Sequence, residues 1–252
     1  LLVALMEGGD RQGLPLPDLS SCIRCGNSLV GPDFLDDPDT ALIDPGTRER
    51  ISVFDWDNAF PHIIGSGGFD GIIGSFPAHR CESLKGEKGY LEKHYRCYPQ
   101  SGELYPCFVE KGIFLLKQGG LLSAAFPDVW LRSKQGSKLR HFLSGSGIQE
   151  IIAPGIRERE NPLIPRTCIV TVSKEEPGES ISVVQGVIPA TGNFVEYLNK
   201  NRYCIPRWRI GQGSWILADT CTQDLVSKIQ GEGTPLAEYV MGALSRGIKR
   251  AD

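Results

Sequence analysis

The stretch Gly67-Gly68-Phe69-Asp70-Gly71-Ile72-Ile73-Gly74-Ser75-Phe76-Pro77 decides the predicted fold. It reads as a short apolar strand that breaks into a loop of Gly, Ser and Pro. Such a break is typical of the carboxyl end of a central parallel strand, where open α/β sheets place their ligands. The sequence therefore predicts an α/β sheet with a ligand site where this strand ends.

Helical and strand-like segments alternate after this stretch. Helices are expected at about 103–117 and 136–143, and strands at 121–126 and 148–152. The first of these helices is followed by a Gly119-Gly120 turn, which is a common way to stop a helix before a strand. This alternation predicts an α/β fold around one sheet.

Three more strands are expected outside this alternation. Residues 167–172 and 181–184 are joined by the turn Glu175-Glu176-Pro177-Gly178, which predicts an antiparallel hairpin at the C-terminal edge of the sheet. Near the N-terminus, Ser21 to Val30 reads as a short buried strand.

Composition excludes several classes of protein. The chain has 252 residues, of which 40% are hydrophobic, as in ordinary globular proteins. No apolar run approaches the about eighteen residues of a membrane-spanning helix. The net charge of −3 argues against a purely electrostatic polyanion binder, because non-specific nucleic-acid affinity comes from Lys and Arg that neutralise phosphates. Any contact with DNA is expected from local basic patches.

The eight cysteines form no repeated spacing, so we expect reduced thiols in a cytoplasmic protein rather than a disulfide scaffold. Cys22 and Cys25 have the spacing of one zinc knuckle, but no second pair follows at a matching interval. The alternative is that both belong to the predicted strand. The histidines have no ligand-like spacing, and we predict no metal site.

Eight short segments follow one another along the chain in an order that is more specific than any one of them. These are Cys22–Leu29, Phe54–Trp56 with Phe60-Pro61, Gly68–Pro77, Leu104-Tyr105, Phe108–Gly112, Leu115–Gly120, Pro127–Leu131 and Lys138–Leu143. In this order the chain resembles the adenine-specific DNA methyltransferase part of type IIG restriction-modification enzymes. Residues 1–188 would be a partial methyltransferase core and residues 189–252 the start of a target-recognition region.

The resemblance implies a fold and a reaction. The fold would be a Rossmann-like sheet of the kind found in S-adenosylmethionine-dependent methyltransferases. The enzymes of this family flip an adenine out of double-stranded DNA and transfer a methyl group to its N6 amine. An Asn-Pro-Pro-Tyr or Asn-Pro-Pro-Phe loop accepts hydrogen bonds from that amine and stacks an aromatic ring on the base.

At the matching positions this chain has Ser75, Phe76, Pro77 and Ala78. Only the second Pro agrees with the family loop. Losing one oriented hydrogen-bonding group at such a site costs about 100- to 1000-fold in rate. Losing a stacked ring costs about 1–3 kcal/mol of base binding. The resemblance therefore implies a severely impaired catalytic loop.

The cofactor is the second departure. The family binds S-adenosylmethionine through a Gly-rich loop and an acidic residue, and the chain is expected to begin after both, with the N-terminal strands of the sheet missing. Asn27 matches the position that contacts the adenine ring of the cofactor, although a turn residue that ends a strand is an equal alternative. We expect no cofactor binding by this chain alone. A longer parent chain or a partner subunit would supply the missing segment.

Basic residues near the C-terminus are candidates for DNA contact. Arg207-Trp208-Arg209 places guanidinium groups on both sides of a ring, an arrangement that suits phosphate contact and base stacking, and Lys249 adds a further cation. A partly buried Trp covered by Arg side chains is the alternative.

The sequence thus predicts a DNA adenine N6-methyltransferase-related protein of a restriction-modification system, impaired or inactive as this chain. Two other readings remain open. One is a non-catalytic DNA-binding or assembly subunit, and the other is a zinc-knuckle protein that uses Cys22 and Cys25.

Overall fold

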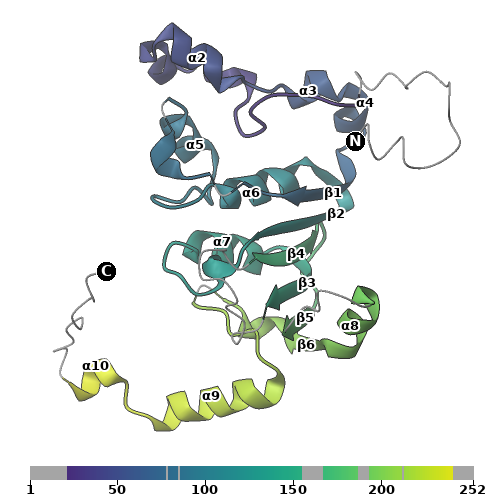
Figure 1. Ribbon diagram of the computed structural model, residues 1–252, viewed down its shortest axis with the longest axis vertical. Coiled ribbons are helices and arrows are strands. Elements are labelled where there is room, and N and C mark those ends of the chain that lie inside the picture. The colour runs from purple at the N-terminus through teal and green to yellow at the C-terminus, as the bar shows by residue number, and fades with distance from the viewer. Residues whose placement is uncertain are drawn as a thin grey trace, which may run out of the picture.

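The computed structural model describes residues 22–77, 79–84, 86–154, 167–186, 193–211 and 213–240 (Figure 1). In this part of the chain, six strands form one open sheet in the order β1-β2-β4-β3-β5-β6. Their bounds are β1 Phe69–Ser75, β2 Leu116–Pro127, β3 Gly147–Pro154, β4 Thr167–Ser173, β5 Ser180–Gly186 and β6 Arg202–Pro206.

Short helices connect and flank these strands. The α-helices are α2 Pro45–Ile51, α3 Trp56–Ala59, α4 Pro61–Gly65, α5 Lys88–His94, α6 Tyr105–Leu115, α7 Ser137–Ser144, α8 Phe194–Asn201, α9 Thr220–Glu232 and α10 Leu236–Tyr239. The 3₁₀ helices are η1 Pro32–Leu35, η2 Pro38–Leu42, η3 Cys81–Ser83, η4 Asp128–Leu131 and η5 Arg207–Arg209. None of the helices within the described ranges is long and apolar enough to cross a membrane.

The sheet is mixed, and its first two strands are parallel. β1 pairs with β2 in register from Gly71 opposite Leu121 to Ser75 opposite Ala125. The chain between them runs through α5 and α6, and α6 packs against β2. A Cβ atom at Gly112 would come within 3.2 Å of the Leu122 side chain, so this glycine permits the close approach of helix and strand. The predicted α/β sheet is confirmed.

The predicted hairpin is wrong in its pairing. β4 and β5 follow one another in the chain, but β3 lies between them, antiparallel to β4 and parallel to β5. The antiparallel partner of β5 at the edge of the sheet is β6. In β3, Ile151 and Ile152 point to opposite faces of the sheet and are both buried. An interior position satisfies both faces of β3 and both of its backbone edges.

The strand expected over 21–30 is also absent. Residues 22–30 form a turn with one isolated bridge, from Asn27 to Val53. Leu29 and Val30 are buried as the apolar pattern suggests, but they belong to a hydrophobic cluster shared with Phe34, Tyr90 and other residues outside the sheet. Apolar residues alone did not distinguish a buried turn from a buried strand.

The main hydrophobic core lies between the sheet and the helices and loops that pack against it. Trp130 and Trp215 pack edge to face, with ring centroids 5.2 Å apart, and both are buried. β6 and Trp215 thus join the same body as the strands before residue 188. α9 and α10 lead away from the sheet toward the C-terminus (Figure 1). The division at residue 188 stays a prediction.

Candidate functional site

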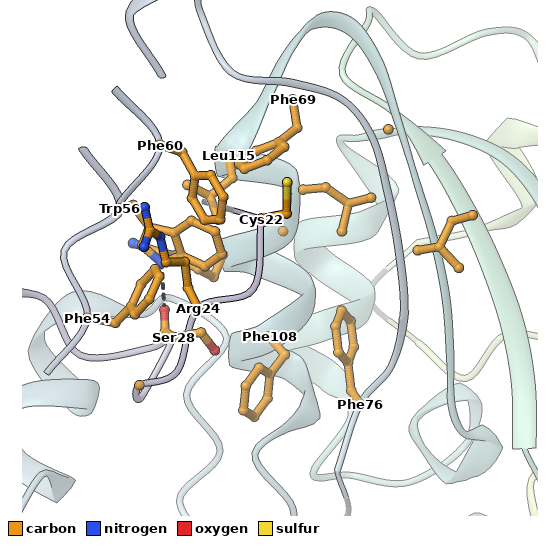
Figure 2. A pocket seen from close by; sticks show the side chains of 16 residues that line it. Cys22, Arg24, Ser28, Phe54, Trp56, Phe60, Phe69, Phe76, Phe108 and Leu115 are labelled. Atoms are coloured by element: carbon orange, nitrogen blue, oxygen red, sulfur yellow. Dashed lines mark hydrogen bonds between the residues drawn. The ribbon is translucent and has the colours of Figure 1, made fainter. Parts of the chain in front are cut away.

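Beside the outer edge of β1 lies an aromatic cavity of about 450 Å³ (Figure 2). Its walls come from residues 22–28, from residues 54–76 and from α6. Six aromatic side chains line it, namely Phe54, Trp56, Phe60, Phe69, Phe76 and Phe108. This volume falls within the about 300–1,000 Å³ range of small-molecule sites.

Trp56 organises one side of the aromatic cavity. Its ring meets those of Phe54 and Phe69 edge to face, with centroids 4.8 Å and 5.9 Å away. The indole Nε1 donates a hydrogen bond of 3.1 Å to the Ser28 carbonyl, drawn as a dashed line in Figure 2. An indole N–H that is removed from water usually finds such a partner, and Trp56 is half-buried. This bond ties the α3 region to the turn at residues 22–30.

The loop at the end of β1 contributes Phe76 to the wall. The Phe76 amide donates to the Ala125 carbonyl at 3.0 Å, which continues the pairing of β1 with β2 by one residue. The Phe76 ring stacks between those of Phe108 and Phe126, at centroid distances of 5.6 Å and 6.4 Å. A Cβ atom at Gly74 would lie 3.0 Å from this ring, so the glycine makes room for it.

The other described residues of the predicted loop are more accessible than Phe76. Ser75 and Pro77 are exposed, and Ser75 is the last residue of β1. Ala78 lies outside the described residues. The ring of Phe76 therefore packs into the protein, whereas the neighbouring Ser75 is accessible to solvent.

Asn27 serves the turn in which it sits. Its side-chain oxygen accepts a hydrogen bond of 3.2 Å from the backbone amide of Leu29, and the backbone amide of Asn27 donates to the Ser52 carbonyl at 2.7 Å. Gly26 and Ser28 on either side line the aromatic cavity. The turn alternative is thus realised, and a contact between Asn27 and a cofactor stays a prediction.

Arg207 holds several loops together. Its guanidinium donates to the carbonyls of Gly178, Ser144, Ser146 and Ile148 at 2.8–3.3 Å. Burial lowers the pKa of this guanidinium. The Arg207 donors are occupied by the backbone of the protein.

Trp208 is the accessible residue of the predicted DNA cluster, whereas the side chain of Arg209 beside it is only 14% exposed. Trp208 is 77% exposed, and the Arg209 guanidinium lies 4.9 Å from the centroid of its ring. Arg209 also donates to Gln223 and Asp224, at 2.6 Å in each case. The alternative of a partly buried Trp does not hold. Lys249 lies outside the described residues.

Two cations in the aromatic cavity were missed by the sequence reasoning. Lys111 and Arg24 line it, and no Asp or Glu does so in the described part of the chain. Burial is the main reason why the pKa of Lys111 is lowered, and Asp33 and Asp57 oppose the shift. The spacing of α6 could have revealed Lys111, because residues 108, 111, 112 and 115 fall on one helical face.

The sheet, the loop after β1 and the cavity next to it can be compared with known proteins. A family model described as Eco57I restriction-modification methylase matches residues 15–156, more than half of the chain. The chain belongs to this family. It is therefore a member of a methyltransferase family of restriction-modification systems, as the resemblance implied.

Curated relatives of this Eco57I-family chain are type II enzymes. It is 30% identical over 122 residues to the type II methyltransferase M.TthHB8I of Thermus thermophilus, covering 48% of this chain and 28% of the relative. It is 27% identical over 185 residues to the type II restriction enzyme and methyltransferase RM.Eco57I of Escherichia coli, covering 69% and 17%. The Eco57I-family chain thus spans less than a third of either relative.

Similar solved structures include other restriction-modification proteins. The type IIG restriction endonuclease BpuSI has a TM-score of 0.38 and 17% identity, with 57% of this chain and 19% of BpuSI covered. The M protein of the type I restriction enzyme EcoKI has a TM-score of 0.39 and 15% identity, with 80% and 37% covered.

Proposed function

We propose that this chain is the base-binding part of a DNA adenine N6-methyltransferase that acts on double-stranded DNA, and that its own catalytic loop is impaired. The observation that carries the proposal is the position of Ser75 and Phe76 at the carboxyl end of β1, in a chain of the Eco57I family. This is the edge at which open α/β sheets bind their ligands.

The reaction requires acceptors for the protons of the adenine amine. The lone pair of that amine is delocalised into the ring, so oriented oxygen atoms must localise it as positive charge develops. In this loop the exposed Ser75 hydroxyl and the Phe76 carbonyl are the available acceptors. Ser is shorter than the Asn of the family loop, so a base held at the same distance would lose one of its hydrogen bonds.

Base stacking is the second weakness of the loop. The Phe76 ring occupies the space between Phe108 and Phe126 and cannot also cover a flipped base. Ala78 carries no ring at the position where the family has Tyr or Phe. Both defects act on the bound base, so we expect duplex DNA to bind and to react very slowly.

The fit of S-adenosylmethionine to the aromatic cavity is incomplete. The aromatic walls suit the flat adenine ring of the cofactor. Arg24 and Lys111 are cations, however, and the described lining has no carboxylate to balance the positively charged sulfonium. The residues of this chain do not fit the whole cofactor, and we expect them not to bind it with micromolar affinity, which requires about −8.2 kcal/mol.

Two measurements test the proposal on the chain as it exists. Fluorescence anisotropy with a labelled duplex should detect salt-dependent binding, whereas transfer of labelled methyl from S-adenosylmethionine to the same duplex should stay at background. Methylation of adenine at an ordinary enzymatic rate would contradict the impaired loop. Failure to bind duplex DNA under low salt would contradict the base-binding role.

A second candidate is a non-catalytic DNA-binding or assembly subunit. The exposed Trp208 with Arg209 over its ring favours this function. Trp208 follows β6, which lies at the opposite edge of the sheet from β1 and Ser75. Duplex affinity that depends on Trp208 and is unchanged by substitution of Ser75 would favour this candidate over the first.

A further inference from the structure

A second cavity, here called the Glu103 pocket, has walls from three parts of the chain. They are residues 80–82 after β1, residues 99–106 at the start of α6, and residues 129–136 after β2. The Glu103 pocket has a volume of about 350 Å³ and shares no described lining residue with the aromatic cavity. Its size is within the about 300–1,000 Å³ of small-molecule sites, and it lies where the chain leaves the carboxyl ends of two parallel strands.

Backbone contacts hold two of these walls together. Arg80 and Glu103 are partners in an isolated antiparallel bridge, so their side chains lie on the same side of the pairing. Next to them, the Cys81 amide donates to the Gly102 carbonyl at 2.8 Å. The Gly102 amide in turn donates to Glu82 Oε1 at 3.1 Å. Glu103 is therefore fixed on the wall of a pocket that is formed before any ligand arrives.

The Glu103 carboxylate has one oxygen that the protein does not satisfy. Its Oε2 is shielded from solvent and accepts no hydrogen bond from the described residues. An ionised carboxylate is an acceptor only, and a shielded acceptor without a donor costs stability. The last torsion of a Glu side chain is broad, so a small rotation turns both oxygens toward a ligand. The Glu103 pocket thus suits a ligand that brings N–H donors.

The other lining groups add two requirements. Arg80 and Gln135 are exposed at the rim of the Glu103 pocket, and both can donate to an acceptor on the ligand. The apolar part of the wall consists of Pro99, Tyr105, Pro106 and Val129. A fitting ligand therefore has apolar faces, neighbouring donors for a carboxylate and an acceptor for a guanidinium.

We infer that the Glu103 pocket binds an unpaired guanine base, with the Watson–Crick edge of the base on Glu103 and its O6 atom toward Arg80. Guanine has two neighbouring donors on that edge, N1–H and the N2 amine, which match the two oxygens of a carboxylate. The adjacent O6 is an acceptor that guanidinium groups bind. Adenine and cytosine would instead direct a ring-nitrogen acceptor at the carboxylate.

This site uses neither Ser75 nor the aromatic cavity, so the inference stands or falls separately from the proposed methyl transfer. Calorimetry on the full chain tests it with the 5′-monophosphates of guanosine, inosine and adenosine, which carry the same phosphate. Inosine lacks the N2 amine of guanosine. The guanosine nucleotide should bind about tenfold or more tightly than the inosine nucleotide, because a hydrogen bond to a charged group is lost. The adenosine nucleotide should bind more weakly than both.

Matched variants assign the contact to Glu103. Glu103→Gln should reduce the preference for guanosine over inosine to about threefold or less, because a neutral amide offers only one acceptor. Glu92→Gln is the control, since Glu92 is exposed on α5 and does not line the Glu103 pocket. Should Glu103→Gln fail to fold, Arg80→Gln gives an independent test. It should weaken both nucleotides equally, because both carry O6.

A competition experiment then distinguishes the two sources of an unpaired guanine. An oligothymidine strand that contains a single guanine should displace the guanosine nucleotide better than the free nucleotide does if the natural ligand is a DNA strand, and worse if it is a free nucleotide. Either result supports the guanine assignment. Equal affinity for the guanosine and inosine nucleotides, tighter binding of the adenosine nucleotide, or no binding of the guanosine nucleotide would overturn it. An unchanged preference in Glu103→Gln would do the same.

Discussion

Phe76 stacks on Phe108 with ring centroids 5.6 Å apart and an angle of 22° between the ring planes. This contact joins the loop at the end of β1 to the middle of α6. It places the one aromatic side chain of the predicted catalytic loop inside the protein, where it supports the wall of the aromatic cavity.

Phe76→Ala should therefore lower the free energy of unfolding. We expect a loss of about 2–3 kcal/mol, below the about 3–5 kcal/mol of a fully buried Phe because Phe76 keeps some exposure. Urea denaturation measures it. Phe114→Ala is the matched control, since Phe114 is 73% exposed and should cost less than about 1 kcal/mol. Similar losses for both variants would contradict the packing role.

Phe76→Pro, which restores the family residue, should destabilise more than Phe76→Ala. Proline removes the amide that donates to the Ala125 carbonyl at 3.0 Å, in addition to the ring. The extra loss should be about 1 kcal/mol, the net value of a typical hydrogen bond. The comparison uses the same urea assay. An equally stable proline variant would mean that this hydrogen bond contributes nothing.

Trp208→Ala should weaken duplex binding without changing thermal stability. An exposed ring contributes little to folding, whereas stacking on a base is worth about 1 kcal/mol or more, or fivefold in affinity. Anisotropy and a thermal melt measure the two quantities.

Arg207→Gln is the control for the Trp208→Ala experiment, because the reverse pattern is expected for it. It should reduce the melting temperature, because it leaves four backbone carbonyls without their donor, and should change duplex affinity much less. A loss of DNA affinity with no loss of stability in this variant would assign Arg207 to the DNA instead.

Tyr90 should make stability sensitive to high pH. Burial, together with the hydrogen bond from its hydroxyl to Asp33, raises the pKa of Tyr90 from 10.0 to about 12. The folded state thus favours the protonated phenol. This contribution is fully present below pH 10 and disappears as the pH rises through 12.

The measurement is the free energy of unfolding at pH 9–12 for the native chain and Tyr90→Phe. The native chain should lose stability more steeply, because Phe has no proton to release. If the unfolding free energies of the two proteins fell in parallel with pH, the pKa of Tyr90 would be the same in the folded and unfolded states.

The sequence predicted the local elements whose signals are contained in a few neighbouring residues. The opening stretch forms β1 at Phe69–Ser75, and the helix expected at about 103–117 is α6, Tyr105–Leu115. These signals are local because Gly and Pro interrupt strands and a helical period repeats every 3.6 residues. The ordered motifs likewise indicated the family.

Strand order and side-chain roles came only from the tertiary structure. The hairpin prediction was wrong because β3, the strand that precedes β4 in the chain, inserts between β4 and β5 and pairs with both. Asn27 and Arg207 had plausible ligand roles by residue type, but their hydrogen bonds within the protein depend on loops brought together by folding.

By itself, then, the sequence determined that this chain is an α/β protein of a methyltransferase family with an altered loop after β1. The tertiary structure decided that Phe76 faces inward and that Arg24 and Lys111 share one cavity. The physical reason is that secondary structure follows from short-range periodicity and backbone preferences. Cavities and their charge depend on packing between residues that are distant in the chain.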